Sequence, residues 1–147
     1  MIALACDHGA LELKEAIKAH LTERGLAYKD FGTYTKDSCD YPDFGAAAAR
    51  AVASGECERG IVCCTTGIGI SIAANKVKGI RCALLHDHMS ARLTRQHNDA
   101  NMMALGAAIT PPCWPWSSST SSWTPNSRAA ATKDGWIRSA LWRVNAV

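Results

Sequence analysis

The sequence lacks a long apolar run, a cysteine pair at metal-binding spacing and a charge excess in its main part. No run of about eighteen apolar residues occurs, so we expect no membrane-spanning helix. The chain reaches Asp7 and His8 without a basic segment or a long apolar core, which argues against a signal peptide. These absences predict a cytoplasmic protein that does not associate with membranes.

The seven cysteines show none of the patterns that disulfide or metal chemistry requires. Their number is odd, Cys63 and Cys64 are adjacent, and no C-x-x-C pair occurs. Several lie inside apolar runs, where a reduced cysteine behaves as a small hydrophobic residue. His86 and His88 flank Asp87, but without a third ligand in range we interpret them as solvated capping residues. We expect reduced thiols, no metal and no cofactor.

Charge is balanced over most of the chain. Residues 1–106 hold twelve Lys and Arg and twelve Asp and Glu, so the net charge of +3 comes entirely from residues 107–147. A neutral main part argues against nucleic acid as the chief partner. Nucleotide-binding motifs are missing as well, since neither a Walker loop nor G-x-G-x-x-G occurs.

Apolar spacing predicts alternating strands and helices through residues 1–106. Such alternation is typical of an α/β fold whose parallel sheet is covered by helices on both faces. The fully apolar run at residues 60–64 is expected to form a central strand. The expected strands cover residues 2–6, 27–31, 60–64, 80–85 and 102–105, and the expected helices cover residues 10–24, 43–54, 67–76 and 86–96.

Polar residues follow several of these strands. Ligands of parallel sheets bind beyond the carboxyl ends of the strands, so Asp7-His8, Cys64-Thr65-Thr66 and the segment after the fourth strand are expected to converge at one edge. Within the polar run at residues 95–101, His97 is suited to act as a general acid or base near neutral pH. Asp40-Tyr41 could place an acid and an aromatic ring over the pocket, although loop and N-cap chemistry would explain the acid equally well.

The turn after residues 60–64 reads Cys64-Thr65-Thr66-Gly67-Ile68-Gly69-Ile70-Ser71. Backbone N–H groups of such a turn, at the start of a helix, can bind anions. A tight connection between strand and helix would explain the glycines without any ligand. Two interpretations are likewise open for Cys64: a buried thiol at a strand end, or a reactive thiolate favoured by the helix N-terminus. Cys63 is expected on the opposite face, because strand side chains alternate.

The composition changes near residue 107. Residues 107–147 contain all five Trp, four of the five Pro and seven of the eleven Ser, and no helix or strand period runs through residues 107–127. A linker followed by a weak terminal helix would explain this. We hypothesise instead that an atypical tail, residues 107–147, arises from a reading-frame change near residue 107 and follows one domain of residues 1–106.

Long, ordered segments of the chain resemble the type B ribose-5-phosphate isomerases, in the family that also includes the galactose-6-phosphate isomerase subunits. The resemblance covers residues 1 to about 106. The matching segments are Cys6-Asp7-His8-Gly9, Asp30-Phe31-Gly32-Thr33, Asp40-Tyr41-Pro42-Asp43-Phe44-Gly45, residues 67–76, Gly79-Ile80-Arg81 and residues 95–101.

This resemblance implies a Rossmann-like three-layer α/β/α fold of about five strands, a homodimer or dimer of dimers, and a phosphosugar substrate without metal or cofactor. It implies interconversion of ribose and ribulose 5-phosphates, a step of pentose phosphate metabolism, through a cis-enediolate. By position, Cys64 is then the base, and His97 assists ring opening, with Asp40 and Thr66 nearby. The implied substrate-binding residues are Asp7, His8, Tyr41, Thr65, Gly67, Ile68, Gly69, Ser71 and Asn98; the amides of 65–69 would stabilise the enediolate oxygen.

Three departures from the family pattern stand out. Thr65 occupies a position where the family usually has Gly, and it would be strained if that position needs a positive φ. Ala108 stands where the family has Arg. The family's C-terminal segment, which supplies phosphate-binding arginines to the partner subunit, has no counterpart after residue 110. Charge-assisted hydrogen bonds contribute about 1.5–3 kcal/mol each, so these losses would weaken phosphate binding strongly unless other groups replace them.

Two alternatives to ribose 5-phosphate isomerisation follow. A six-carbon phosphate such as allose or galactose 6-phosphate is possible, although Cys64 and the His97-Asn98-Asp99 run favour the ribose type. The other alternative is a catalytically impaired homologue that binds sugar phosphates but lacks the C-terminal phosphate clamp. Turnover of ribose 5-phosphate, with and without a tail that carries the arginines, separates the active isomerase from the impaired homologue.

Overall fold

The computed structural model describes residues 1–110, so the predictions for residues 111–147 lie outside the described part. All five strands are parallel and hydrogen-bond in the order β2-β1-β3-β5-β4. The strands are β1 (Ile2–Cys6), β2 (Tyr28–Asp30), β3 (Arg59–Cys64), β4 (Cys82–Leu84) and β5 (Met102–Gly106). The helices are a 3-10 turn (His8–Ala10), α1 (Leu11–Glu23), α2 (Tyr41–Ala53), α3 (Ile68–Asn75) and α4 (His88–Asn98).

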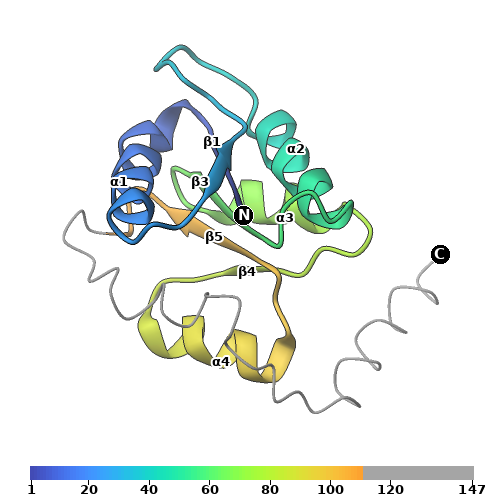
Figure 1. Cartoon of the computed structure of the whole chain (residues 1–147). Helices are drawn as coiled ribbons and strands as arrows, with labels where there is room; N and C mark the ends of the chain where they lie inside the picture. Colours follow the sequence, from blue (N-terminus) through green and yellow to red (C-terminus); the bar gives the residue numbers. More distant parts are fainter. Residues whose placement is uncertain (111–147) are drawn as a thin grey trace.

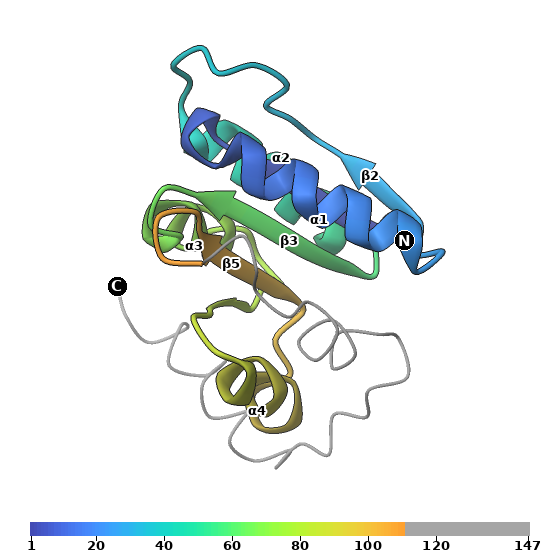
Figure 2. The same ribbon diagram turned by 90° about the vertical axis from the view of Figure 1, so that its left-hand side faces the viewer.

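Helices cover both faces of the sheet, which confirms the predicted three-layer α/β/α fold. Figure 1 shows α1 on one side of the strands and α2 and α3 on the other. Figure 2, turned by 90°, shows α1 running along the sheet with α4 beyond β5. Within residues 1–110 no helix is both long and apolar enough to cross a bilayer.

The two core layers follow from the alternation of side chains along β3. Ile61 and Cys63 pack with Leu13 and Ile17 of α1, whereas Val62 and Cys64 lie in the opposite layer with residues of α2 and α3. The predicted opposition of Cys63 and Cys64 is confirmed. Since β3 pairs with β1 on one side and β5 on the other, both of its faces and both of its edges are covered.

The element boundaries differ slightly from the predicted ones. The helix expected at residues 86–96 begins two residues later, because Asp87 acts as its N-cap and accepts a hydrogen bond from the Ser90 N–H at 2.7 Å. The strand expected at residues 80–85 shortens to Cys82–Leu84, since β4 lies at the sheet edge and pairs only with β5.

Candidate active site

The carboxyl ends of β1 and β3 lie side by side and bring two of the predicted segments together. Cys6 pairs with Cys63, and the Asp7 N–H donates to the Cys63 carbonyl at 3.1 Å. Gly9 touches the next turn, because a Cβ at that position would lie 2.3 Å from Thr65 Oγ1. The expected convergence is therefore confirmed for Asp7-His8 and Cys64-Thr65.

Cys64 ends β3 with its side chain almost completely buried, 4% exposed. Its Sγ accepts a hydrogen bond of 3.0 Å from the Gly67 N–H. This contact requires the chain to reverse sharply, and Gly67 does so with a φ of 78°. An N–H aimed at the sulfur is the arrangement that stabilises negative charge there.

The turn leaves backbone donors at the start of α3. The Ile68 N–H donates to Thr66 Oγ1 at 3.3 Å, and the Ser71 N–H donates to the Gly67 carbonyl at 3.1 Å. The first N–H groups of a helix have no partner within the helix, and the described residues supply no acceptor for those of Gly69 and Ile70. Ile70 is fully buried, whereas Gly69 is partly exposed, so the Gly69 amide is the one available to an anionic group.

The chain after β5 clamps this turn from the other side. The N–H groups of Ala107 and Ala108 donate to the carbonyls of Cys64 and Thr65, each at 2.9 Å. Thr65 adopts no positive φ, since Asp99 is the one non-glycine residue with positive φ in the described part. The strain considered for Thr65 is therefore absent.

Tyr41 lies against the start of α3. A Cβ on Gly69 would come within 2.8 Å of the Tyr41 ring, so the glycine allows the ring to pack on the backbone. Asp40 precedes it as the N-cap residue of α2, but its side chain makes no capping hydrogen bond. The alternative that Asp40 serves as a capping group is therefore not supported. Ser71 is buried, and its hydroxyl donates to the Ile68 carbonyl at 2.7 Å.

Asp7 and His8 are held by backbone donors. Asp7 Oδ1 accepts from the Gly9 N–H at 3.0 Å; burial raises the pKa of this carboxyl, and that hydrogen bond partly offsets the effect. The Cys39 N–H donates to His8 Nδ1 at 3.2 Å, which leaves His8 Nε2 as the N–H donor of the neutral imidazole. His8 is exposed, so this donor is accessible.

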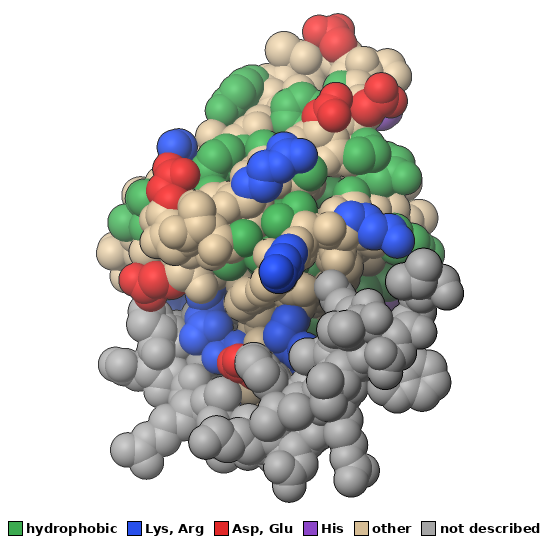
Figure 3. All heavy atoms as spheres, turned by 90° about the vertical axis from the view of Figure 1, so that its right-hand side faces the viewer, with side chains coloured by type: hydrophobic (Ala, Val, Ile, Leu, Met, Phe, Trp, Pro, Cys, Tyr) green, Lys and Arg blue, Asp and Glu red, His purple; other side chains and the backbone are tan. Residues whose placement is uncertain are grey.

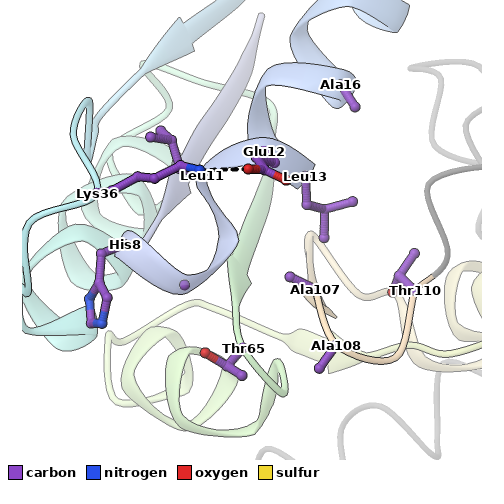
Figure 4. A pocket seen from close by; sticks show the side chains of 11 residues that line it. His8, Leu11, Glu12, Leu13, Ala16, Lys36, Thr65, Ala107, Ala108 and Thr110 are labelled. Carbon is purple, nitrogen blue, oxygen red and sulfur yellow. Dashed lines mark hydrogen bonds and ion pairs between the residues drawn. The ribbon is translucent and has the colours of Figure 1, made fainter.

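A cavity of about 450 Å³ lies beside these residues, between the start of α1 and the chain after β5 (Figure 4). His8, Gly9 and Thr65 line one side of it; Thr65 directly follows Cys64 in the sequence, although Cys64 itself is not among the lining residues. Glu12 and Lys36 also line it and form an ion pair of 2.6 Å. Sequence reasoning missed both, because Glu12 resembles any solvated helix residue and Lys36 belongs to a loop without a motif.

His97 and Asn98 are not part of this edge within one chain. They end α4, which returns from the carboxyl edge to the amino ends of the strands. There the Asn98 carbonyl accepts from Arg81 Nε at 2.6 Å, just before β4 begins. The expected convergence is wrong for this segment, because the helix reverses the direction of the chain before His97 is reached.

Among residues 1–110, no three His, Cys, Asp or Glu side chains are close enough to hold a metal ion. The arrangement offers instead one thiol with an N–H directed at it, one open amide, an imidazole donor and a carboxyl, all around the ends of β1 and β3.

Comparisons with known proteins agree on one family. The model of the Ribose/Galactose Isomerase family matches residues 2–115. Ribose-5-phosphate isomerase B of Escherichia coli is 49% identical over 108 residues, which cover 74% of this chain and 72% of that protein. The structure of ribose-5-phosphate isomerase B from Clostridium thermocellum has a TM-score of 0.86 and 43% identity, covering 98% of this chain and 99% of the other. The enzyme from Mycoplasma genitalium with bound ribulose-5-phosphate gives a TM-score of 0.86 at 30% identity, covering 99% and 97%.

Proposed function

This chain belongs to the Ribose/Galactose Isomerase family, and from that premise we propose that it interconverts ribose 5-phosphate and ribulose 5-phosphate. The reaction is an aldose–ketose isomerisation. The observation that carries the proposal is the Cys64 thiol at the end of β3, which accepts the Gly67 N–H at 3.0 Å beside the open Gly69 amide at the start of α3.

In the proposed mechanism, Cys64 acts as the base on the open-chain sugar. The thiolate removes the proton from C2, the C–H electron pair forms the C1–C2 double bond, and the carbonyl electrons move to O1. The Cys64 thiol then returns the proton to C1 of the cis-enediolate, and the O2 proton moves to O1, so that the C2 ketone and the C1 alcohol form together. The amide of Gly69 is suited to stabilise the developing negative oxygen, because a fixed N–H donor needs no reorganisation.

The remaining residues of this edge are assigned to substrate binding. Asp7 and His8 contact the sugar or its phosphate, with the His8 Nε2–H as a donor. Tyr41 and the turn at residues 65–69, which includes Thr66, form the wall next to Cys64, and Asp40 precedes Tyr41 in the sequence. Ser71 contributes indirectly, since its hydroxyl is engaged in the first turn of α3.

Ring opening by His97 requires a second copy of the chain. His97 lies at the amino edge, whereas Cys64 lies at the carboxyl edge of the same sheet. We therefore propose a homodimer, or a dimer of dimers, in which His97 and Asn98 of one subunit complete the Cys64 site of the other. An isologous pairing would make two such sites.

Exposed apolar side chains beside the site support such a dimer. Ile68 and Ile72 of α3 are 50% and 55% exposed, and Tyr41 at the start of α2 is 40% exposed. Figure 3 shows hydrophobic side chains intermingled with Lys and Arg on the side of the molecule that carries α2 and α3. Large apolar side chains gathered on an exposed face are typical of protein contact surfaces.

Proton NMR of ribose 5-phosphate in D2O tests the function directly. We expect conversion to ribulose 5-phosphate with incorporation of solvent deuterium at C1, because the proton taken from C2 resides on the Cys64 sulfur and can exchange for deuterium before it is returned. Galactose 6-phosphate and allose 6-phosphate serve as competing substrates, since the family model covers galactose isomerases as well. Conversion of a six-carbon phosphate alone, or of none of the three, would contradict the proposal.

A further inference from the structure

A sugar phosphate needs a cation, and the cavity beside Cys64 offers one. Among the described residues that line this cavity, Lys36 is the single Lys or Arg. Ala107 and Ala108 contribute methyl groups to the facing wall. Resting on the proposed isomerase function, we propose that Lys36 is the phosphate-binding cation of this site and leaves Glu12 when the phosphate enters.

The Lys36–Glu12 ion pair is easily opened. Its Nζ–Oε1 distance is 2.6 Å, but the side chains are 70% and 84% exposed. Exposed ion pairs contribute little to stability, so a phosphate dianion can compete for the ammonium group. Hydrogen bonding to Lys36 lowers the pKa of Glu12, so this carboxylate stays charged and would repel a phosphate in the same cavity. Lys36 therefore decides whether the cavity attracts or repels an anion.

The loop that carries Lys36 is tied to the fold on both sides. On one side, the Thr33 carbonyl accepts a hydrogen bond of 2.6 Å from the fully buried Lys14 Nζ. On the other, the Cys39 N–H donates to His8 Nδ1. The backbone of this loop is thus held at the rim of the cavity, while the long side chain of Lys36 is free to turn between Glu12 and a ligand.

Two further donors face the same space. His8 presents its Nε2–H, and Thr65 presents a hydroxyl, and both line the cavity with Lys36. One cation and two neutral donors match the three terminal oxygens of a phosphate. Thr65 follows Cys64 directly, so a phosphate held here would be separated from the thiol by the length of a sugar chain, as proton transfer at C2 of a pentose 5-phosphate requires.

Three variants test this assignment: Lys36→Gln, Glu12→Gln, and Lys29→Gln as the matched control. Lys29 also forms an exposed ion pair, with Glu56, and it does not line the cavity. Isothermal titration measures the Kd for inorganic phosphate and for ribose 5-phosphate, and steady-state kinetics measures KM and kcat. We expect Lys36→Gln to raise both Kd values and KM about ten-fold or more, with kcat changed little, because it removes a charge-assisted hydrogen bond. Glu12→Gln should lower them, and Lys29→Gln should leave them unchanged.

A fourth variant places a new cation in the same cavity. Ala108→Arg in the Lys36→Gln background should recover phosphate affinity, because residue 108 lines the same space. Unchanged phosphate affinity in Lys36→Gln, weaker binding in Glu12→Gln, or no measurable phosphate binding by the unaltered chain would overturn the assignment. Failure of the isomerase proposal looks different: phosphate binding depends on Lys36, yet ribose 5-phosphate is not converted.

Discussion

Adjacent cysteines at the end of β3 illustrate how position alone separates a core residue from a reactive one. Burial raises the pKa of Cys63 well above its ordinary value, and it raises the pKa of Cys6 and of Cys82 to about 12. These thiols remain protonated core residues. The surroundings of Cys64 differ from those of the other three, since its sulfur accepts a hydrogen bond from the Gly67 N–H in the turn that leads into α3.

Gly67 is the residue on which this contact depends. Its φ is 78°, and a Cβ would lie 2.9 Å from the Leu105 carbonyl carbon. Gly79 offers a matched control, because its φ is 87° and a Cβ there would meet nothing within 4 Å. Gly67→Ala should lower the free energy of unfolding by about 3 kcal/mol or more, and Gly79→Ala by about 1 kcal/mol, since only the first adds a clash to the strained backbone.

Urea denaturation of both variants measures the difference between them. Equal losses would show that the close packing of β5 against the turn does not constrain Gly67.

At this scale the sequence predicts some site residues and not others. Cys64, Asp7 and His8 could be predicted from the sequence, because each lies at or just after the end of an apolar strand. In parallel sheets, ligands bind at the carboxyl ends of the strands. Lys36 and Glu12 could not be predicted, because their ion pair joins a loop to a helix across 24 residues. No local pattern records such a contact.

Among the elements, α1 and β2 are joined by a buried ion pair. Lys14 of α1 is fully buried, and its Nζ lies 2.9 Å from Asp30 at the end of β2. Lys18 reaches the same carboxylate at 3.2 Å from a more exposed position. Lys14→Met should lower the free energy of unfolding by about 3 kcal/mol, because it leaves a buried carboxylate poorly compensated. Lys18→Met should cost clearly less, and thermal unfolding compares the two; a larger loss in Lys18→Met would contradict this account.

The same pair gives the stability a dependence on acid. Burial alone would raise the pKa of Asp30, but hydrogen bonds from the Gly32 N–H, Lys14 and Lys18 outweigh it and hold the pKa below its usual value of 3.8. A carboxyl with a depressed pKa in the folded state stabilises fully above its unfolded pKa and loses this contribution as the pH falls through the folded pKa.

We therefore expect the contribution of Asp30 to the free energy of unfolding to be constant above about pH 5. It should decline below pH 3.8, where the unfolded chain takes up the proton first. Asp30→Asn should flatten this decline. Acid titration of stability for the two proteins checks it, and parallel curves would show that Asp30 contributes nothing to acid sensitivity.

The elements themselves were largely predictable, and the exceptions have physical causes. The strand β3 is easily predicted from the sequence, because both of its faces are buried and every position after Arg59 is therefore apolar. The start of α4 was placed too early because the side chain of Asp87, not the apolar pattern, decides where the helix begins. Edge position shortened β4, which no window of sequence reveals.

For the whole molecule, the decisive question is which copy of the chain supplies His97. The segment after the fourth strand was expected to converge with Cys64, but α4 carries His97 and Asn98 to the opposite edge of the sheet. The length of the predicted helix could have indicated that His97 lies at the opposite edge of the sheet from Cys64. The pairing between subunits could not be predicted, because it depends on a surface that forms only after folding.

Mixing two inactive variants tests the shared site. Cys64→Ala and His97→Asn should each abolish turnover, but heterodimers formed from both would contain one intact site. Random exchange of subunits should restore about a quarter of the unaltered sites, because half the dimers are mixed and each has one complete site. Absence of recovery, despite exchange shown by native mass spectrometry, would place both residues in the same subunit's site.

The C-terminal tail gives a further prediction about the molecule as a whole. A chain in which residues 107–147 are replaced by a tail carrying the family's phosphate-binding arginines should show a lower KM for ribose 5-phosphate, since added cations stabilise bound phosphate. Activity found only after the replacement would favour the impaired-homologue alternative. Equal KM values would show that the tail arginines are dispensable and that the groups of residues 1–110 hold the phosphate.

The central claim is that Cys64 moves the proton, and one kinetic comparison tests it most directly. Cys64→Ala and Cys63→Ala remove neighbouring thiols of the same strand, one from each face. Loss of a general base typically lowers kcat by about a hundred- to ten-thousand-fold, so Cys64→Ala should lose ribose 5-phosphate turnover to that extent. Cys63→Ala should retain it in a folded protein. Turnover that survives in Cys64→Ala, with deuterium still incorporated from solvent, would contradict the account.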